Sequence, residues 1–341
     1  MIFDPSPQLD IKETEELFPE HSYYNAKFLG KGGCGSVFIV RSSQYNQDFC
    51  IKRIQIHKGN YDGYAENEAT ALIRLCHPNI ISMYEFFFDR TLSFLYIVLE
   101  YCRGGSLKDL IERKGPIKPP LLYSYCYQIL NALLHCHEQN IAHRDIKPSN
   151  ILLDNYGRIK LADFGLSKML KKGELINSFS GSRQHMAPEV ILRKNVDPFL
   201  ADIWSLGTTF YAIAFGYLPW GECTEEDMDM AISLGMLTFP THADRDFCNL
   251  IRSMVVVNPA KREPLQNLVN SPLFDKIQKH NFTSMSPASG GVSQAPQIKK
   301  PSHVPASFSY NRIISNRRGT KACVLNNQQN RLKSKMQHTF A

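Results

Sequence analysis

The sequence has no two cysteines close enough for a C-x-x-C metal-binding knuckle, because the nearest pair among its nine, Cys126 and Cys136, is ten residues apart. An odd number of widely spaced cysteines also argues against a secreted disulfide framework. Residues 1–5 lack a basic region followed by an apolar run, so we expect no secretory signal peptide. These absences favour an intracellular protein of the cytoplasm or nucleus.

Long apolar stretches are scarce. Residues 203–221 run for 19 positions without a charged side chain, which meets the length of a membrane span. The same stretch contains Ser205, Thr208 and Pro219, and no basic residue anchors either end. We therefore favour a buried core helix that ends near Gly216 over a transmembrane segment.

Acidic side chains are missing from the last 66 residues. Residues 276–341 carry 11 Lys and Arg and no acid, whereas residues 1–275 carry 28 basic and 32 acidic side chains. The net charge of +7 therefore lies in the tail, and we do not expect specific nucleic-acid binding by the body. Leu, Ile, Val and Phe make up only 12 of the 66 tail residues. Such a composition predicts a disordered basic tail that could dock acidic partners.

The rest of the chain is rich enough in apolar residues to bury a core. With 341 residues, 43% hydrophobic and 21% charged, it is expected to form two lobes plus an extension rather than a coiled coil or a disordered chain. We divide it into an acidic leader (1–23), a folded region (24–275) and the tail (276–341). The residue pattern predicts strands at 24–29, 36–40, 49–54, 93–101, 150–153 and 158–161, helices at 66–75 and 122–136, and mainly helix from 187 to 274.

A glycine-rich segment with the pattern G-x-G-x-x-G-x-V occupies residues 30–37, between two predicted strands. Glycines let a backbone approach phosphate oxygens closely. A hairpin turn without any function is an equally simple interpretation of three glycines. A dinucleotide-binding fold would need a helix after the last glycine, and residues 36–40 are strand-like instead. The pattern therefore favours a flap over a nucleotide.

Lys52 ends an apolar stretch at residues 49–52. An exposed lysine at a strand end is the usual situation for this residue type. An inward-facing Lys52 would need a counter-charge, which Glu68 on the predicted helix could supply. Glu68 itself could equally be an exposed helix carboxylate.

The densest chemical signal is H-R-D-x-K-x-x-N at residues 143–150, followed by D-F-G at 163–165. Asp145 could accept the proton of a hydroxyl, and Lys147 could neutralise a transferring phosphoryl group. Asn150 and Asp163 offer the oxygen ligands that Mg²⁺ prefers. Any one of these residues alone would more often be an ordinary loop residue, but their joint occurrence is not expected by chance.

Taken together, these motifs resemble the eukaryotic protein kinase family, from about residue 24 to 274. Further matches are G-S at 181–182, M-A-P-E at 186–189, D-x-W-x-x-G at 202–207, and Arg262. Lys147 and the G-S pair are similar to the serine/threonine class. The resemblance implies an α+β, two-lobed fold, with a small β-rich N-lobe (24–99) containing one main helix, a hinge (100–103) and a larger, mostly helical C-lobe (104–275).

The resemblance also implies an ATP-dependent transfer of phosphate to serine or threonine hydroxyls of proteins. It would make Asp145 the catalytic base, assisted by Lys147 and by Lys52 paired with Glu68. Asn150 and Asp163 would bind Mg²⁺, which Mn²⁺ could replace. The ATP-binding residues would be Gly30, Gly32, Gly33, Gly35, Val37, Cys50, Lys52, Leu99 as gatekeeper, Glu100, Cys102 and Leu152.

Other implied features are structural. Glu189 and Arg262 would form a buried ion pair, residues 203–216 the central helix of the C-lobe, and Leu72, Met83, His143 and Phe164 a stacked apolar spine. Cys50 stands where the family usually has alanine, Cys34 where it has an aromatic residue or serine, and His185 where it has tyrosine. The tyrosine replacement puts the wall of the substrate pocket in doubt.

Two other classes of protein remain alternatives. A pseudokinase scaffold would be expected to have lost Lys52, Asp145, Asn150 or Asp163, and all four are present. A small-molecule kinase of related fold would generally lack the segment around residues 187–189.

The family resemblance also suggests regulation by phosphorylation of the activation loop, residues 163–189, by an upstream kinase. Arg144 and Lys168 would form the phosphate pocket, and the candidate phosphosites are Ser178, which we favour, and Ser180. Positions that are acidic in kinases selecting arginine before the acceptor are here Ser106, Ser149 and Ala212. We therefore expect an enzyme that is not strongly basophilic.

Overall fold

The computed structural model describes residues 18–32, 35–56, 64–89, 93–171, 173–177, 180–193, 195–221, 223–275 and 277. Gly33, Cys34, Ser178 and the tail from residue 278 lie outside these ranges, as do residues 1–17. The expectations placed on those residues therefore stay predictions.

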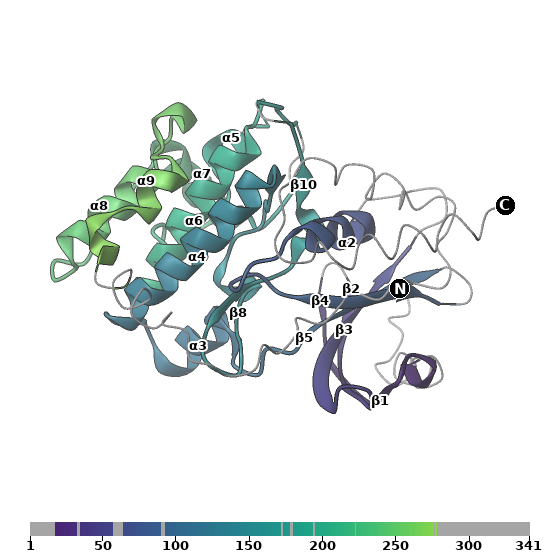
Figure 1. Cartoon of the computed structure of the whole chain (residues 1–341). Helices are drawn as coiled ribbons and strands as arrows, with labels where there is room; N and C mark the ends of the chain where they lie inside the picture. Colours follow the sequence, from purple (N-terminus) through teal and green to yellow (C-terminus); the bar gives the residue numbers. More distant parts are fainter. Residues whose placement is uncertain are drawn as a thin grey trace. The chain divides into compact units, whose positions relative to one another are not determined.

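The first half of the described chain forms a five-stranded antiparallel sheet in the order β1-β2-β3-β5-β4 (Figure 1). The helix α2 (Tyr64–Arg74) lies between β3 and β4 in the chain. Three of the four strands predicted for this region coincide closely with β1, β2 and β3, and the fourth coincides with β5. The strand β4 was missed. The strands are β1 (Tyr23–Gly32), β2 (Gly35–Ser42), β3 (Gln47–Gln55), β4 (Met83–Phe88) and β5 (Phe94–Glu100).

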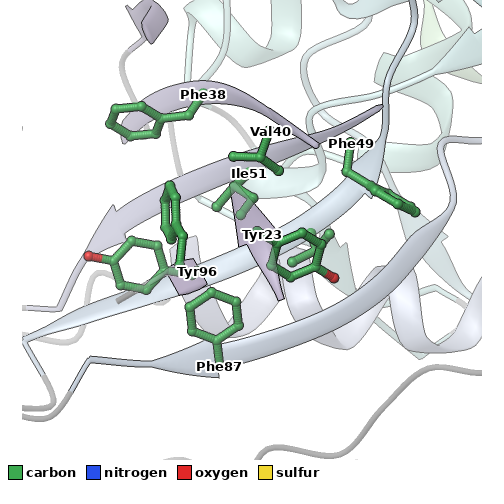
Figure 2. Packing of buried hydrophobic residues seen from close by; sticks show 9 residues of the cluster. Tyr23, Phe38, Val40, Phe49, Ile51, Phe87 and Tyr96 are labelled. Atoms are coloured by element: carbon green, nitrogen blue, oxygen red, sulfur yellow. The ribbon is translucent and has the colours of Figure 1, made fainter. Parts of the chain in front are cut away.

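One face of this sheet is covered with aromatic and branched side chains at alternate strand positions, the spacing that places residues on the same face. Figure 2 shows this cluster, which contains Phe38, Phe49 and Ile51 among its fully buried members. Phe18, from the short 3-10 helix η1 (Phe18–His21), packs edge-on against the rings of Phe38 and Tyr96, with ring centroids 6.0 and 5.7 Å away. Residues 18–21 belong to the range predicted as a leader, and two of them, Phe18 and His21, pack against the sheet.

The second half is mainly helical, with two small β-sheets (Figure 1). The long helices α4 and α6 contact each other, α8 packs on α6, and α9 packs on α4. The β-strands are β6 (Gly105–Ser106), β7 (Ile141–Ala142), β8 (Ile151–Leu153), β9 (Ile159–Leu161) and β10 (Lys168–Met169). The α-helices are α3 (Leu107–Lys114), α4 (Leu121–Glu138), α5 (Pro188–Ile191), α6 (Pro198–Phe215), α7 (Glu225–Leu234), α8 (Arg245–Met254) and α9 (Leu265–Val269). The 3-10 helices are η2 (Pro148–Asn150), η3 (Phe164–Leu166), η4 (Arg183–His185), η5 (Pro259–Lys261) and η6 (Pro272–Phe274).

The apolar stretch at residues 203–221 forms most of α6. Asp197 caps this helix by accepting hydrogen bonds from the backbone N–H groups of Phe199 and Leu200, and Gly216 ends it in the left-handed conformation at φ 86°. Trp204 is fully buried, so the stretch is the core helix that the sequence favoured. Among the residues that the structure describes, no helix combines the length and apolarity needed to cross a bilayer.

Candidate active site

A buried lysine joins the two halves of the described chain. Lys52 on β3 donates from Nζ to Oε2 of Glu68 on α2 at 2.7 Å and to Oδ1 of Asp163 at 2.7 Å. The side chain of Glu68 is only 1% exposed and that of Lys52 is 10% exposed. Lys52 is therefore the inward-facing lysine with a carboxylate partner, and the exposed alternative is excluded for both residues.

The three groups of this cluster shift one another's pKa values, and burial raises that of Glu68. Burial alone would lower the pKa of the Lys52 ammonium, but the charges of Glu68 and Asp163 outweigh burial and raise that pKa. Burial alone would also raise the pKa of Asp163, yet the charge and hydrogen bond of Lys52 lower it below its usual value. The site thus holds a cation and the Asp163 anion in their ionised forms near neutral pH.

Asp145 lies at the centre of a second polar cluster. Its Oδ1 accepts hydrogen bonds from the backbone N–H and the hydroxyl of Ser182, both at 3.0 Å. Its Oδ2 lies 2.8 Å from Nζ of Lys147 and accepts a hydrogen bond from Nδ2 of Asn150 at 2.9 Å. Lys147 also donates to the Ser182 hydroxyl at 2.6 Å. The carboxylate is therefore held in one orientation, because each of its two oxygens has its own partners.

The backbone that carries Asp145 is fixed by a carboxylate from α6. Asp202, whose side chain is fully buried, accepts hydrogen bonds from the backbone N–H groups of His143 and Arg144, each at 2.8 Å. Arg144 adopts a left-handed conformation at φ 70°, which costs a non-glycine residue about 1–2 kcal/mol. The two bonds to Asp202 help to offset this strain, so the D-x-W-x-x-G motif acts on Asp145 through the backbone.

Two members of the predicted apolar spine are in contact, and the other two are buried. The rings of His143 and Phe164 are in contact, with centroids 4.8 Å apart, and both side chains are fully buried. Leu72 and Met83 are 2% and 6% exposed, and α2 contacts η3, which begins at Phe164. A buried ring of Phe164 fixes the position of the neighbouring Asp163, beside Lys52.

The described glycines of the glycine-rich segment lie at the adjoining ends of β1 and β2. Gly32 pairs with Gly35, and Gly30 pairs with Val37. Gly35 adopts φ 142°, and a Cβ there would lie 2.0 Å from the carbonyl oxygen of Arg53 on β3. Strand packing therefore requires glycine at position 35. A Cβ on Gly30 would meet no atom within 4 Å, so packing of the protein itself does not require glycine at position 30.

The apolar residues assigned to the adenine side come from several elements. Cys50 and Leu99 are neighbours across β3 and β5, and Leu152 lies on β8. Leu99 and Cys102 are each 8% exposed. Burial raises the pKa of the Cys50 thiol to about 12, so it behaves as a small apolar side chain. Glu100, placed in the hinge, has its carboxylate 2.8 Å from Nζ of the buried Lys160, a partner that no sequence motif indicates.

The activation segment meets Arg144 through Ser180. Arg144 donates from Nη2 to the hydroxyl of Ser180 and from Nη1 to the carbonyl oxygen of Leu166 at 3.1 Å. Lys168 lies on β10, is exposed, and pairs with Ala142 on β7. The structure therefore brings one of the two candidate phosphosites, Ser180, to Arg144, while Ser178 lies outside the described residues.

The expected ion pair of the C-lobe is present and bidentate. Arg262 donates from Nη1 and Nη2 to the two oxygens of Glu189 at 2.6 and 2.7 Å, and Arg262 is 3% exposed. His185, in place of the usual tyrosine, is buried with Nδ1 3.0 Å from the hydroxyl of Thr208. Burial lowers the pKa of His185 to about 4, so this histidine is neutral at physiological pH.

Comparisons with known proteins agree with this geometry. The sequence pattern of the protein kinase domain matches residues 23–274. A Mus musculus protein named as sperm motility kinase W is 34% identical over 267 residues, which is 78% of this chain and 53% of the relative. CBL-interacting serine/threonine-protein kinase 12 of Arabidopsis thaliana is 33% identical over 264 residues, covering 76% of this chain and 53% of the relative.

A Dictyostelium discoideum protein named as serine/threonine-protein kinase MARK-C is also 33% identical over 264 residues, covering 76% of this chain and 34% of the relative. The chain thus spans about a third to a half of the length of these three relatives. Their names, the domain match and the assembled site agree on one family. The chain belongs to the eukaryotic protein kinase family and to its serine/threonine class.

Proposed function

We propose that this protein transfers the γ-phosphate of ATP to serine and threonine hydroxyls of other proteins. The observation that carries the proposal is the preassembled pair of clusters, Lys52 with Glu68 and Asp163, and Asp145 with Lys147 and Asn150. Phosphoryl transfer asks for positioning and charge stabilisation more than for covalent chemistry, and both clusters supply that.

The nucleotide would lie beneath the turn of Gly30, Gly32 and Gly35, with Lys52 binding its phosphates. The adenine would lie among the apolar side chains of Val37, Cys50, Leu99 and Leu152, and the backbone of residues 100–102 would bind its polar edge. Support comes from the different elements that carry these residues, because side chains from β2, β3, β5 and β8 can surround a planar ring.

The donor set fits Mg²⁺, with Mn²⁺ as a substitute. Nδ2 of Asn150 is committed to Asp145, which leaves its amide oxygen as the remaining donor atom, and Asp163 contributes a carboxylate. Within the described residues, no group of three or more His, Cys, Asp or Glu side chains could hold a metal by itself. Mg²⁺ in phosphate sites typically needs only one or two carboxylates besides the phosphates. The ion would neutralise charge on the transferring group.

Asp145 would orient the acceptor hydroxyl and take its proton. Lys147, 2.8 Å from the same carboxylate, would offset negative charge that develops beside it. The hydroxyl of Ser182 contacts both Asp145 and Lys147, and we therefore do not expect Ser182 to be a phosphosite.

A pseudokinase scaffold is the second candidate, and one experiment separates the two functions. Full-length protein is incubated with radiolabelled ATP and either dephosphorylated casein or myelin basic protein, beside its Asp145→Asn variant. We expect label on serine or threonine in the wild-type reaction and about 10²–10⁴-fold slower turnover in the variant, with nearly unchanged ATP affinity. Wild-type protein that binds ATP without transferring phosphate would instead be a scaffold.

The proposal extends to how the enzyme is regulated, which partners it binds and in which compartment it acts. Phosphorylation of the activation loop by an upstream kinase would place a phosphate against Arg144 and Lys168, and the Arg144–Ser180 contact supports that region as the receiving site. The basic tail would dock acidic partners. The cytoplasm or nucleus suits a chain whose seven described cysteines are all free thiols.

A further inference from the structure

The segment formed by residues 182–185 is fastened at each residue by a different part of the protein. Ser182 is bound to Asp145 and Lys147. The carbonyl oxygen of Gln184 accepts a hydrogen bond from Nε1 of Trp220 at 2.9 Å. The carbonyl oxygen of His185 accepts one from the hydroxyl of Ser205 at 2.8 Å. A segment held this way, directly beside Asp145, is suited to receive an acceptor chain.

The remaining residue of this segment, Arg183, is bound by α7. Arg183 donates from Nε to Oδ1 of Asp229 at 3.1 Å and from Nη2 to Oδ2 of the same carboxylate. Two parallel bonds of this kind fix the direction as well as the distance between the partners. The two residues are 46 positions apart in the chain, and no known motif of the sequence links them.

The exposure of the pair argues against a mainly stabilising role. The side chains of Arg183 and Asp229 are 38% and 28% exposed. Ion pairs in contact with solvent typically add about 0–1 kcal/mol to folding stability. Of the other acids in the first turn of α7, Glu225 acts on Arg183 only through its charge, Asp227 accepts a hydrogen bond from the hydroxyl of the N-cap Thr224, and Glu226 is exposed. The consequence of the Arg183–Asp229 pair is therefore local, at the position of the 182–185 segment.

From this geometry we infer that Asp229 is a positioning residue for the protein acceptor. Through Arg183 it holds the 182–185 segment so that Ser182 stays bound to Asp145, and the ion pair sets the affinity for the acceptor while leaving the nucleotide side untouched. This inference rests on the proposed kinase function, whose ATP-side residues lie on other elements.

The test is steady-state kinetics of the full-length protein with casein or myelin basic protein, whichever the wild type phosphorylates. The variants are Asp229→Asn, Arg183→Gln, Arg183→Lys, and the exchange of Arg183→Asp with Asp229→Arg. Glu226→Gln is the matched control, because it removes one charge from the same helix. Acceptor and ATP concentrations are varied separately, and thermal unfolding is followed for every variant.

We expect Asp229→Asn and Arg183→Gln to raise KM for the acceptor about 3- to 10-fold, a loss typical of one solvent-exposed charged pair. KM for ATP and the unfolding temperature should stay close to wild type. Arg183→Lys should recover only part of the acceptor affinity because lysine lacks the two-pronged geometry. The exchanged pair should recover more than half of it, and Glu226→Gln should match the wild type.

Two results would overturn the inference while leaving the kinase function intact. One is an active wild type whose Asp229 and Arg183 variants have unchanged acceptor KM. The other is a parallel rise of both KM values with a lower unfolding temperature and no recovery in the exchanged pair, which is the behaviour of a purely structural contact. A wild type that transfers no phosphate to either protein would refute the proposed function first and this inference with it.

Discussion

Nζ of Lys52 lies 2.7 Å from Oε2 of Glu68, and this bond ties the helix α2 to the sheet at its central strand β3. The Glu68 carboxylate is almost completely withdrawn from solvent, so the bond depends on both charges being present. The position of α2 and the ionisation of Lys52 are thereby coupled.

Replacing this lysine should strongly reduce turnover. In Lys52→Met we expect kcat to fall about 10²–10³-fold, the range seen when one preorganised donor aimed at developing charge is removed. The measurement is turnover at saturating ATP and acceptor. Lys108→Met, at an exposed position on α3, is the control and should retain wild-type kcat. A Lys52→Met enzyme within threefold of wild type would remove this residue from the chemistry.

The Glu189–Arg262 pair should be a major contributor to stability once either partner is removed. In Glu189→Ala the guanidinium of Arg262, whose side chain is 0% exposed, would be left without its carboxylate. We expect the free energy of unfolding to fall by about 3–5 kcal/mol in urea titrations. Glu112→Ala, which breaks an exposed pair with Lys108, should change it by less than about 1 kcal/mol. Equal losses in the two variants would contradict the buried-pair argument.

His185 should make the stability depend on pH in one direction. Burial is the main cause of its low pKa, about 4, with Lys147 also lowering it and Asp145 opposing. Between pH 6.5 and about 4 the unfolded chain binds a proton at this histidine that the folded chain does not. Stability should therefore fall as the pH is lowered through that window, by up to about 3 kcal/mol from this group.

The measurement for His185 is the slope of unfolding free energy against pH. His185→Gln should lose less stability between pH 6.5 and pH 4 than the wild type, by roughly the amount given above. His242→Gln, at an exposed histidine, should follow the wild-type curve. Parallel curves for His185→Gln and wild type would show that His185 titrates normally in the folded protein.

Phosphorylation of the activation loop should raise activity through Arg144. Mass spectrometry of the active enzyme is expected to find phosphate on Ser178, with Ser180 as the second candidate because its hydroxyl already contacts Arg144. A phosphate there gains up to three charge-assisted hydrogen bonds. Ser178→Ala should stay poorly active whatever upstream kinase is added. Full activity in enzyme unmodified at both serines would end this hypothesis.

The elements with strong local patterns were predictable from the sequence. The strands β1, β2, β3 and β5 show apolar and β-branched runs between turns, and α4 shows the apolar stripe of a helix. The strand β4 has no such clarity because Glu85 lies in its middle. In the structure that carboxylate is buried and accepts a hydrogen bond from the hydroxyl of Tyr23 at 3.1 Å, with Nδ1 of His21 3.3 Å from its other oxygen.

The missed strand and the packing of residue 21, which lies in the range predicted as a leader, share one contact between distant residues. His21 comes from the segment interpreted as a leader, and its interaction with Glu85 joins residues 64 positions apart. A charged residue argues against a buried strand when only the sequence is read. The partner that allows its burial is distant in the chain and is seen only in the folded structure.

The site likewise contains residues that the sequence predicted and contacts that it did not. The motifs located Lys52, Asp145, Asn150 and Asp163 because these residues occur in short patterns at the spacing typical of the family. Contacts between segments without a motif could not be foreseen, as in the Arg183–Asp229 pair or the hydrogen bond from Trp220 to Gln184. These depend on how α7 and the loop after α6 meet the 182–185 segment, which is a property of tertiary packing.

The buried ring of Phe18 has a practical consequence for work with fragments of this protein. A fragment cut to the domain match would start at residue 23 and would strip the covering ring from Phe38 and Tyr96. Losing one buried phenylalanine forfeits about 1.5–3 kcal/mol and bares an aromatic surface to water. Expression of such a fragment should yield less soluble material than one beginning upstream of Phe18, so the choice of start site decides whether crystallisation or screening begins with a well-behaved sample.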